Sequence, residues 1–107
     1  MSSGNGEVVS VKILANTGSS PQGKLVDAEV IFEAGSGPLH GLRLIGFSVW
    51  ERRDGGRNVT FPARQYSVNG ERRSFALLRP ANGDANAQDA IRQSILDAYT
   101  RAAAAVS

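Results

Sequence analysis

Apolar and polar residues alternate in the first third of this 107-residue chain. The alternation covers residues 8–14 and, more regularly, residues 25–32, where acidic side chains separate the apolar ones. A period of two is typical of antiparallel strands that bury one face and leave the other in water. The pattern therefore predicts two antiparallel strands, joined by a loop at residues 16–23 that contains glycine, serine and proline.

The middle of the chain predicts four further strands of unequal length. Residues 39–50 are apolar on both faces, and Gly41 and Gly46 within them indicate a bulge, a bend or a closely approaching backbone. Asn69-Gly70 favours a type I′ hairpin turn, because both residues tolerate a positive φ. The predicted strands are residues 39–50, 59–61, 66–68 and 73–78, with a strand end at Pro62, which has no N–H to donate.

The C-terminal part of the chain changes to helical periodicity. Asn86 is the expected N-cap, and Asp89 lies in the first turn, where the helix dipole favours negative charge. The apolar stripe that this helix would bury consists of Ile91, Ile95, Ala98, Tyr99, Ala102 and Val106. Together these elements predict an α+β fold, an antiparallel β-sheet of four to six strands with one C-terminal α-helix packed on it.

Length and composition indicate a single domain over residues 1–107, with residues 1–6 frayed. A chain of this length is too short for two hydrophobic cores. Hydrophobic residues make up 41% and charged residues 21%, which is the balance of a folded, soluble protein. The absence of cysteine excludes disulfides and thiolate chemistry. No apolar run approaches the roughly 20 residues of a membrane helix, and no signal-peptide pattern is present, so we expect a cytoplasmic protein without a membrane partner.

Positive charge is concentrated in the middle of the chain. Net charge is only +2, but residues 43–79 carry eight arginines against three acidic residues, which gives +5. The segments before and after it carry −2 and −1. A guanidinium group is a flat, forked donor that matches the geometry of phosphate. The arginines predicted to bind the phosphate backbone of a nucleic acid are Arg52, Arg53, Arg57, Arg64, Arg72 and Arg73.

A second interpretation of these arginines stays open. Glu51, Asp54 and Glu71 lie near them in sequence, and if they neutralise the arginines, the charges only keep strand edges solvated. Exposed aromatic rings would favour binding, because they stack on unpaired bases, whereas aromatic residues in the strands of a small domain more often belong to the core. The aromatic residues in question are Trp50, Phe61 and Tyr66.

Residues suited to catalysis or metal binding are sparse. His40 is the only histidine, and a general base needs a positioned partner, which the sequence does not show. Asp27, Glu29 and Glu33 fit the wet face of a strand better than a cation site. The glycine-rich pieces do not precede a helix with phosphate-loop spacing. We therefore expect no enzymatic activity, no cofactor and no metal; a small-molecule enzyme is the least favoured alternative.

The order of these elements resembles the SpoVG family, the stage V sporulation protein G-like bacterial proteins. The resemblance runs from about residue 8 to residue 101 and rests on the order and spacing of five segments. These are residues 9–13 (VSVKI), 28–32 (AEVIF), 39–46 (LHGLRLIG), 59–64 (VTFPAR) and 90–99 (AIRQSILDAY).

The resemblance implies a small regulator that binds DNA, and in some cases RNA, and dimerises through strands. It also implies a DNA contact near the helix end, where Arg101 is the matching basic residue. Together with the segmental charge, it predicts a SpoVG-like, non-enzymatic, homodimeric nucleic-acid-binding regulatory protein. The choice of DNA or RNA, the target sequence and the dimer edge stay open. The alternative is a protein-interaction or structural module whose exposed sheet edge takes a partner strand.

Overall fold

In the part of the chain that the structure describes, a four-stranded sheet, a two-stranded ribbon, one α-helix and a short 3-10 helix are present. The computed structural model describes residues 8–15, 22–84 and 86–105; the predictions for residues 1–6, for residues 16–21 of the first loop and for Val106 lie outside them. The elements are β1 (Val9–Ala15), β2 (Lys24–Phe32), a 3-10 helix (Gly37–Leu39), β3 (Arg43–Glu51), β4 (Arg57–Thr60), β5 (Ala63–Val68), β6 (Glu71–Ala76) and α1 (Asn86–Ala105). Strands β1 to β4 pair antiparallel in sequence order, while β5 and β6 pair only with each other. The predicted α+β fold is confirmed.

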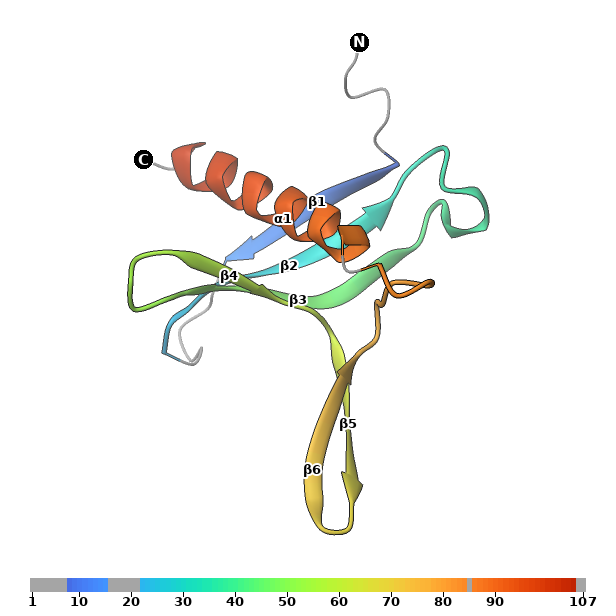
Figure 1. Cartoon of the computed structure of the whole chain (residues 1–107). Helices are drawn as coiled ribbons and strands as arrows, with labels where there is room; N and C mark the ends of the chain where they lie inside the picture. The colour runs from blue at the N-terminus through green and yellow to red at the C-terminus, as the bar shows by residue number, and fades with distance from the viewer. Residues whose placement is uncertain (1–7, 16–21, 85, 106–107) are drawn as a thin grey trace.

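The hydrophobic core lies between one face of the four-stranded sheet and α1, which crosses that face (Figure 1). Alternation in β2 directs its buried side chains toward the helix, as the period of two predicted. Phe47 of β3 and Ile95 of α1 are both 0% exposed and meet in this layer. The buried cluster consists of Val26, Ala28, Val30, Phe47, Val49, Val59 and Ile95.

The opposite face of the sheet is polar at its centre. Arg43 donates a hydrogen bond of 2.8 Å to Glu29, and Ser48 donates one of 3.1 Å to Asp27. Lys24 forms an ion pair of 2.6 Å with Asp27. The acidic residues of β2 therefore lie on the wet face of a strand and pair with neighbouring side chains.

The predicted third strand begins four residues later than expected. Residues 37–39 form a 3-10 turn, and Gly41 with φ of +88° turns the chain before β3 starts at Arg43. The predicted start was wrong because apolar residues continue through the 3-10 turn and the turn at Gly41. Gly46 has φ of +106°, and an added Cβ would come within 2.9 Å of Pro62 Cβ. Of the alternatives predicted for Gly46, the structure shows a bulge beside it and a close approach by Pro62.

The register of β3 against β2 shifts beside Gly46. Ala28 faces Phe47 and Val30 faces Leu44, so β3 has one extra residue between these pairs. Such a bulge keeps Leu44 and Phe47 on the core side although three positions separate them. The extra residue leaves Ile45 at the surface, where it is 60% exposed.

The β5–β6 ribbon leaves the sheet after Pro62 and projects away from both the sheet and the helix (Figure 1). Pro62 follows β4 and accepts a hydrogen bond of 2.9 Å from the Leu77 amide, which closes the base of the ribbon. At the tip, Asn69 has φ of +53° and Gly70 has φ of +82°. Both central turn residues thus have positive φ, which confirms the predicted type I′ hairpin. Both strands begin earlier than predicted.

Helix α1 begins at Asn86, ten positions after the ribbon ends at Ala76. Asn86 was the predicted N-cap, but it belongs to the helix itself, and Asp84 Oδ1 accepts its amide hydrogen at 3.0 Å. The carboxylate of Asp84 therefore satisfies one of the amides that a helix start leaves open. Within the described residues, no helix is long and apolar enough to cross a membrane.

Candidate nucleic-acid interface

The seven arginines predicted to contact nucleic acid fall into three places. The β3–β4 turn carries Arg52, Arg53 and Arg57, the ribbon carries Arg64, Arg72 and Arg73, and the end of α1 carries Arg101. The β3–β4 turn and the ribbon tip point in different directions from the sheet (Figure 1). A single protomer therefore does not bring all seven arginines together in one patch.

Backbone hydrogen bonds hold the β3–β4 turn in a defined shape. The Arg52 amide donates to the Gly56 carbonyl at 2.7 Å, and the Gly56 amide donates to Asp54 Oδ1 at 2.8 Å. Arg52 Nε lies 4.0 Å from the same Asp54 oxygen, and both side chains are mostly exposed. Water screens an exposed pair at that distance strongly. Arg53 forms no ion pair among the described residues.

Arg57 has a packing role. Its guanidinium carbon lies 4.9 Å from the ring centroid of Tyr99, a cation–π geometry that ties the start of β4 to α1. Arg92 makes the same kind of contact with Phe61, at 5.2 Å, and pairs with Asp89. Arg57 stays a predicted phosphate contact, and its contact with Tyr99 also joins the helix to the sheet.

The register of the ribbon sorts its side chains onto two faces. Residues directly opposite each other in an antiparallel pair share a face. One face, called here the polar face, consists of Gln65 opposite Ser74 and Ser67 opposite Arg72. The other, called here the aromatic face, consists of Arg64 opposite Phe75, Tyr66 opposite Arg73 and Val68 opposite Glu71.

The two faces of the ribbon differ in how far their side chains are already engaged. On the aromatic face, the Tyr66 and Phe75 rings lie 5.7 Å apart, and Arg73 donates to Glu71 at 2.9 Å. On the polar face, Gln65 and Ser74 line a hollow of about 160 Å³ together with Arg72 and Arg73. Among the described residues, Arg72 has no ion pair, and neither has Arg64 on the other face.

The surrounding aromatic residues divide between core and surface. Phe61 packs edge-on against Phe47, with ring centroids 5.1 Å apart, and belongs to the core margin. Trp50 is half-buried, and its Nε1 donates to Thr60 Oγ1 at 2.9 Å. Tyr66 is 41% exposed and Phe75 is 38% exposed. Of the aromatic residues that the structure describes, only these two of the ribbon are exposed.

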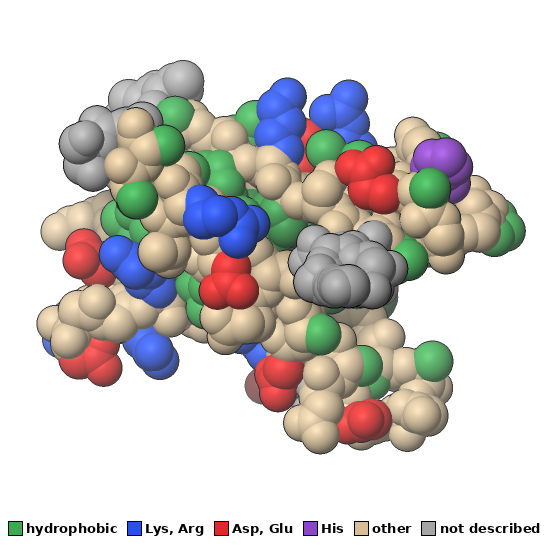
Figure 2. Space-filling model, turned by 90° about the horizontal axis from the view of Figure 1, so that it is seen from above, with side chains coloured by type: hydrophobic (Ala, Val, Ile, Leu, Met, Phe, Trp, Pro, Cys, Tyr) green, Lys and Arg blue, Asp and Glu red, His purple; other side chains and the backbone are tan. Residues whose placement is uncertain are grey.

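Arg101 lies away from the other six arginines, beside β1. It lines a small polar hollow with Ser94, Asp97 and the start of β1. Asp97 accepts a hydrogen bond of 2.9 Å from Gln93. Figure 2 shows the molecule from above, where basic and acidic side chains are interspersed and form no continuous basic patch. This side therefore lacks the concentrated positive charge of the ribbon.

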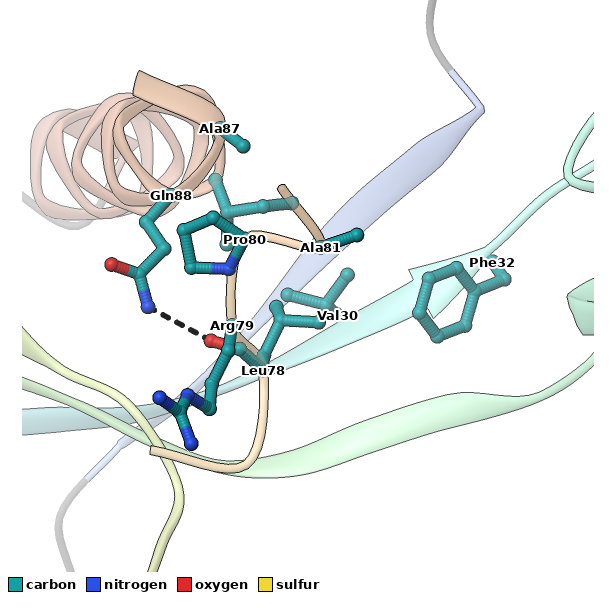
Figure 3. Close-up of a pocket in the computed structure, with 9 residues that line it drawn as sticks. Val30, Phe32, Leu78, Arg79, Pro80, Ala81, Ala87 and Gln88 are labelled. Carbon is teal, nitrogen blue, oxygen red and sulfur yellow. Dashed lines mark hydrogen bonds between the residues drawn. The ribbon is translucent and has the colours of Figure 1, made fainter. Parts of the chain in front are cut away.

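An apolar cavity of about 180 Å³ lies between the start of α1, β2 and the segment before the helix (Figure 3). Gln88 Nε2 donates to the Leu78 carbonyl at 2.9 Å and holds this segment against the helix. Arg79 is the one charged residue of the lining, and it extends away from Phe32 in Figure 3. His40 is exposed beside the 3-10 turn. In the described ranges, no three histidine or acidic side chains gather as metal ligands.

Sequence reasoning missed the polar residues of the ribbon. Gln65, Ser67 and Ser74 were not among the predicted contacts, although they share a face with Arg72. The signal was available in principle, because the Asn69-Gly70 turn sets the pairing of the residues on either side of it. Comparison with protein families, with curated proteins and with solved structures gives no match for this chain.

Proposed function

We propose that this protein is a non-enzymatic, SpoVG-like nucleic-acid-binding regulatory protein that contacts the phosphate backbone through its ribbon and its β3–β4 turn. The observation that carries the proposal is the ribbon, which holds three arginines against one acidic residue and buries none of their side chains. Guanidinium groups held on a projecting, hydrogen-bonded scaffold are suited to phosphate contacts. Arg53, Arg64 and Arg72 are the foremost contacts, since no carboxylate of the described residues pairs with them.

Salt-dependent binding tests this function. Fluorescence anisotropy with labelled duplex DNA, single-stranded DNA and RNA, at several salt concentrations, should detect micromolar or tighter binding at low salt. If five arginines each neutralise one phosphate of a duplex, log K falls against log salt with a slope of about −4 to −5. Arg53→Ala and Arg64→Ala should each reduce that slope by about 1.

A matched control uses a basic residue outside the ribbon. Lys12 is exposed on β1, at the other edge of the sheet, so Lys12→Ala removes the same charge. Provided that light scattering shows the same oligomeric state as the wild type, this variant should leave the slope unchanged. If the protein shows no salt-sensitive binding to any of the three nucleic acids, the proposal is wrong.

The homodimer is proposed to form through the outer edge of β1. This strand pairs with β2 over all seven residues, and it contains neither glycine nor proline. The other edge strand, β4, has only four residues and stops before Pro62. An apolar hollow of about 380 Å³ between β1 and α1 lies beside the β1 edge, lined by Ile13, Tyr99, Ala102 and Ala103 among others. Light scattering should give twice the chain mass, and Ala103→Arg should return it to the monomer.

A second candidate function is a protein-interaction module. Strand β4 pairs with β3 only from Ser48 onward, so residues 43–47 have no described ladder partner on that side. Ile45 stands at this open stretch and is largely exposed. A segment of a partner could add there as a strand. Recovery of one specific protein without nucleic acid, lost on Ile45→Asp, would favour this function.

A further inference from the structure

We propose that the polar face of the β5–β6 ribbon reads base edges in the major groove of double-stranded DNA. This inference rests on the proposed function and names its substrate class. It assigns Gln65, Ser67, Arg72 and Ser74 to base contacts, and it leaves phosphate contacts to arginines elsewhere. Four observations carry it: the shape of the ribbon, its register, its side-chain chemistry and the state of its other face.

The shape of the ribbon fits the major groove. Six residue pairs run from Ala63 opposite Ala76 to Val68 opposite Glu71. At about 3.3 Å per residue, such a strand is roughly 20 Å long. The major groove of B-DNA is about 12 Å wide and admits a two-stranded ribbon of this kind. Because the ribbon projects from the body (Figure 1), the sheet and helix need not enter the groove with it.

The register gathers base-reading side chains on one face. Gln65 lies opposite Ser74, and Ser67 lies opposite Arg72, so the four form two adjacent cross-strand pairs. The guanidinium of arginine reads guanine through two acceptors, the amide of glutamine reads adenine, and the serine hydroxyl bonds to either. At the base of the ribbon, the next pair on this face is Ala63 with Ala76, which is small. The polar face therefore offers donors and acceptors without a bulky apolar side chain between them.

The absence of an ion pair at Arg72 among the described residues favours a role for this side chain in base contacts. Among the described residues, Arg72 forms no ion pair, whereas its neighbour Arg73 is engaged by Glu71 at 2.9 Å. Arg72 lines a surface hollow together with Gln65, Arg73 and Ser74. Arg72 can therefore donate two parallel hydrogen bonds to a base without first breaking a contact within the protein.

The aromatic face supports the ribbon and is less suited to base reading. Tyr66 and Phe75 contact each other at 5.7 Å with an angle of 58° between the ring planes. An isolated two-stranded hairpin is only marginally stable in water, so this cross-strand contact helps to hold the register. A fixed register keeps the four polar side chains in one geometry. Stacking of unpaired bases on these rings is the competing possibility, and it requires single-stranded nucleic acid.

The test begins with selection of bound sequences from a random duplex library. Selection should yield a consensus that contains a guanine, and footprinting should show that the bound protein protects this guanine. Replacing that guanine by 7-deazaguanine removes one major-groove acceptor and keeps base pairing. We expect the affinity for the selected duplex to fall about tenfold on this replacement.

Matched variants of the ribbon separate reading from charge. Arg72→Ala should lower affinity for the selected duplex about ten- to a hundredfold more than affinity for a scrambled duplex. Arg72→Lys keeps the charge but loses the forked donor, so it should lose the same discrimination. Arg64→Ala removes an equal charge from the opposite face and should weaken both duplexes alike. Circular dichroism confirms that each variant is folded.

Three results would overturn the inference. The first is salt-sensitive duplex binding that yields no consensus, or in which Arg72→Ala and Arg64→Ala lower the affinity for both duplexes equally. This result leaves the proposed function intact, but the ribbon then contacts only phosphates. Tighter binding to single strands, abolished by Tyr66→Ala, assigns recognition to the aromatic face instead. Failure to bind any nucleic acid overturns the proposed function as well, and is thus distinct from the other two results.

Discussion

The sheet-and-helix body and the β5–β6 ribbon differ in how far their side chains are buried. The body buries seven residues in one cluster and satisfies its polar face with internal hydrogen bonds and ion pairs. None of the twelve ribbon residues, all of them described, is buried. Side chains in a packed core are constrained by shape and volume. Those of the ribbon are free of that constraint, so their polar and cationic character is available for contacts with another molecule.

Paired truncations of phenylalanine give the strongest test of this contrast. Phe47→Ala should lower the free energy of unfolding by about 3–5 kcal/mol, because Phe47 is fully buried and the cavity cannot fill completely. Phe75→Ala removes the same group from the ribbon and should cost about 1 kcal/mol or less. Urea unfolding followed by circular dichroism measures both. Equal losses would mean that the ribbon packs on the body in solution.

Alanine at Gly46 tests the junction between body and ribbon. Gly46→Ala should destabilise the protein by about 2–4 kcal/mol, since it adds left-handed strain and a clash with Pro62. Gly55→Ala is the matched control: Gly55 also has positive φ, but nothing lies within 4 Å of its added Cβ. That variant should cost only the strain, about 1–2 kcal/mol. Thermal unfolding of both proteins would separate the clash from the strain.

Alanine at Gly70 should loosen the ribbon alone. Gly70 has φ of +82° at the hairpin tip, where a side chain costs about 1–2 kcal/mol of local stability. Hydrogen exchange should accelerate roughly tenfold in the amides of β5 and β6, because the local opening equilibrium shifts by that energy. Amides of β2 and β3 should keep their rates. Faster exchange in the body as well would show that the two regions unfold together.

The smallest expected effect concerns Arg57. A double-mutant cycle with Arg57→Met and Tyr99→Leu should give a coupling free energy of about 0.5–1 kcal/mol, the usual size of a surface cation–π contact. We expect Arg57→Met to reduce nucleic-acid binding less than Arg53→Met does, because Arg57 already contacts Tyr99. If Arg57→Met lowers the affinity for nucleic acid more than Arg53→Met does, Arg57 contacts the nucleic acid directly.

Local signals in the chain predicted the elements well and their limits less well. The period of two in β2, the helical stripe of α1 and the Asn69-Gly70 turn each depend on a few neighbouring residues, and all three appear in the structure. The late start of β3 was missed, because apolar composition does not distinguish a strand from a glycine turn. Asp84 replaced Asn86 as the capping side chain, since either residue type can cap and only backbone geometry selects one.

The candidate site was predictable in composition but not in arrangement. The sequence identified an arginine-rich middle segment, and six of its arginines were predicted contacts. It could not show that Arg57 contacts a ring on α1, that Arg73 is engaged by Glu71, or that Arg72 has no ion pair among the described residues. These differences depend on angles and distances between side chains, which charge counts do not contain.

The amino-acid sequence by itself determined the α+β class, the antiparallel pairing, the helix stripe and the hairpin tip, because periodicity and permitted φ values act over a few residues. The tertiary structure decided which face the side chains beyond these local patterns occupy. The bulge at Gly46 keeps Leu44 and Phe47 in the core, and strand pairing places Arg72 beside Gln65 and Ser74. The first result depends on packing between segments far apart in the chain, whereas the Asn69-Gly70 turn sets the register of the ribbon locally.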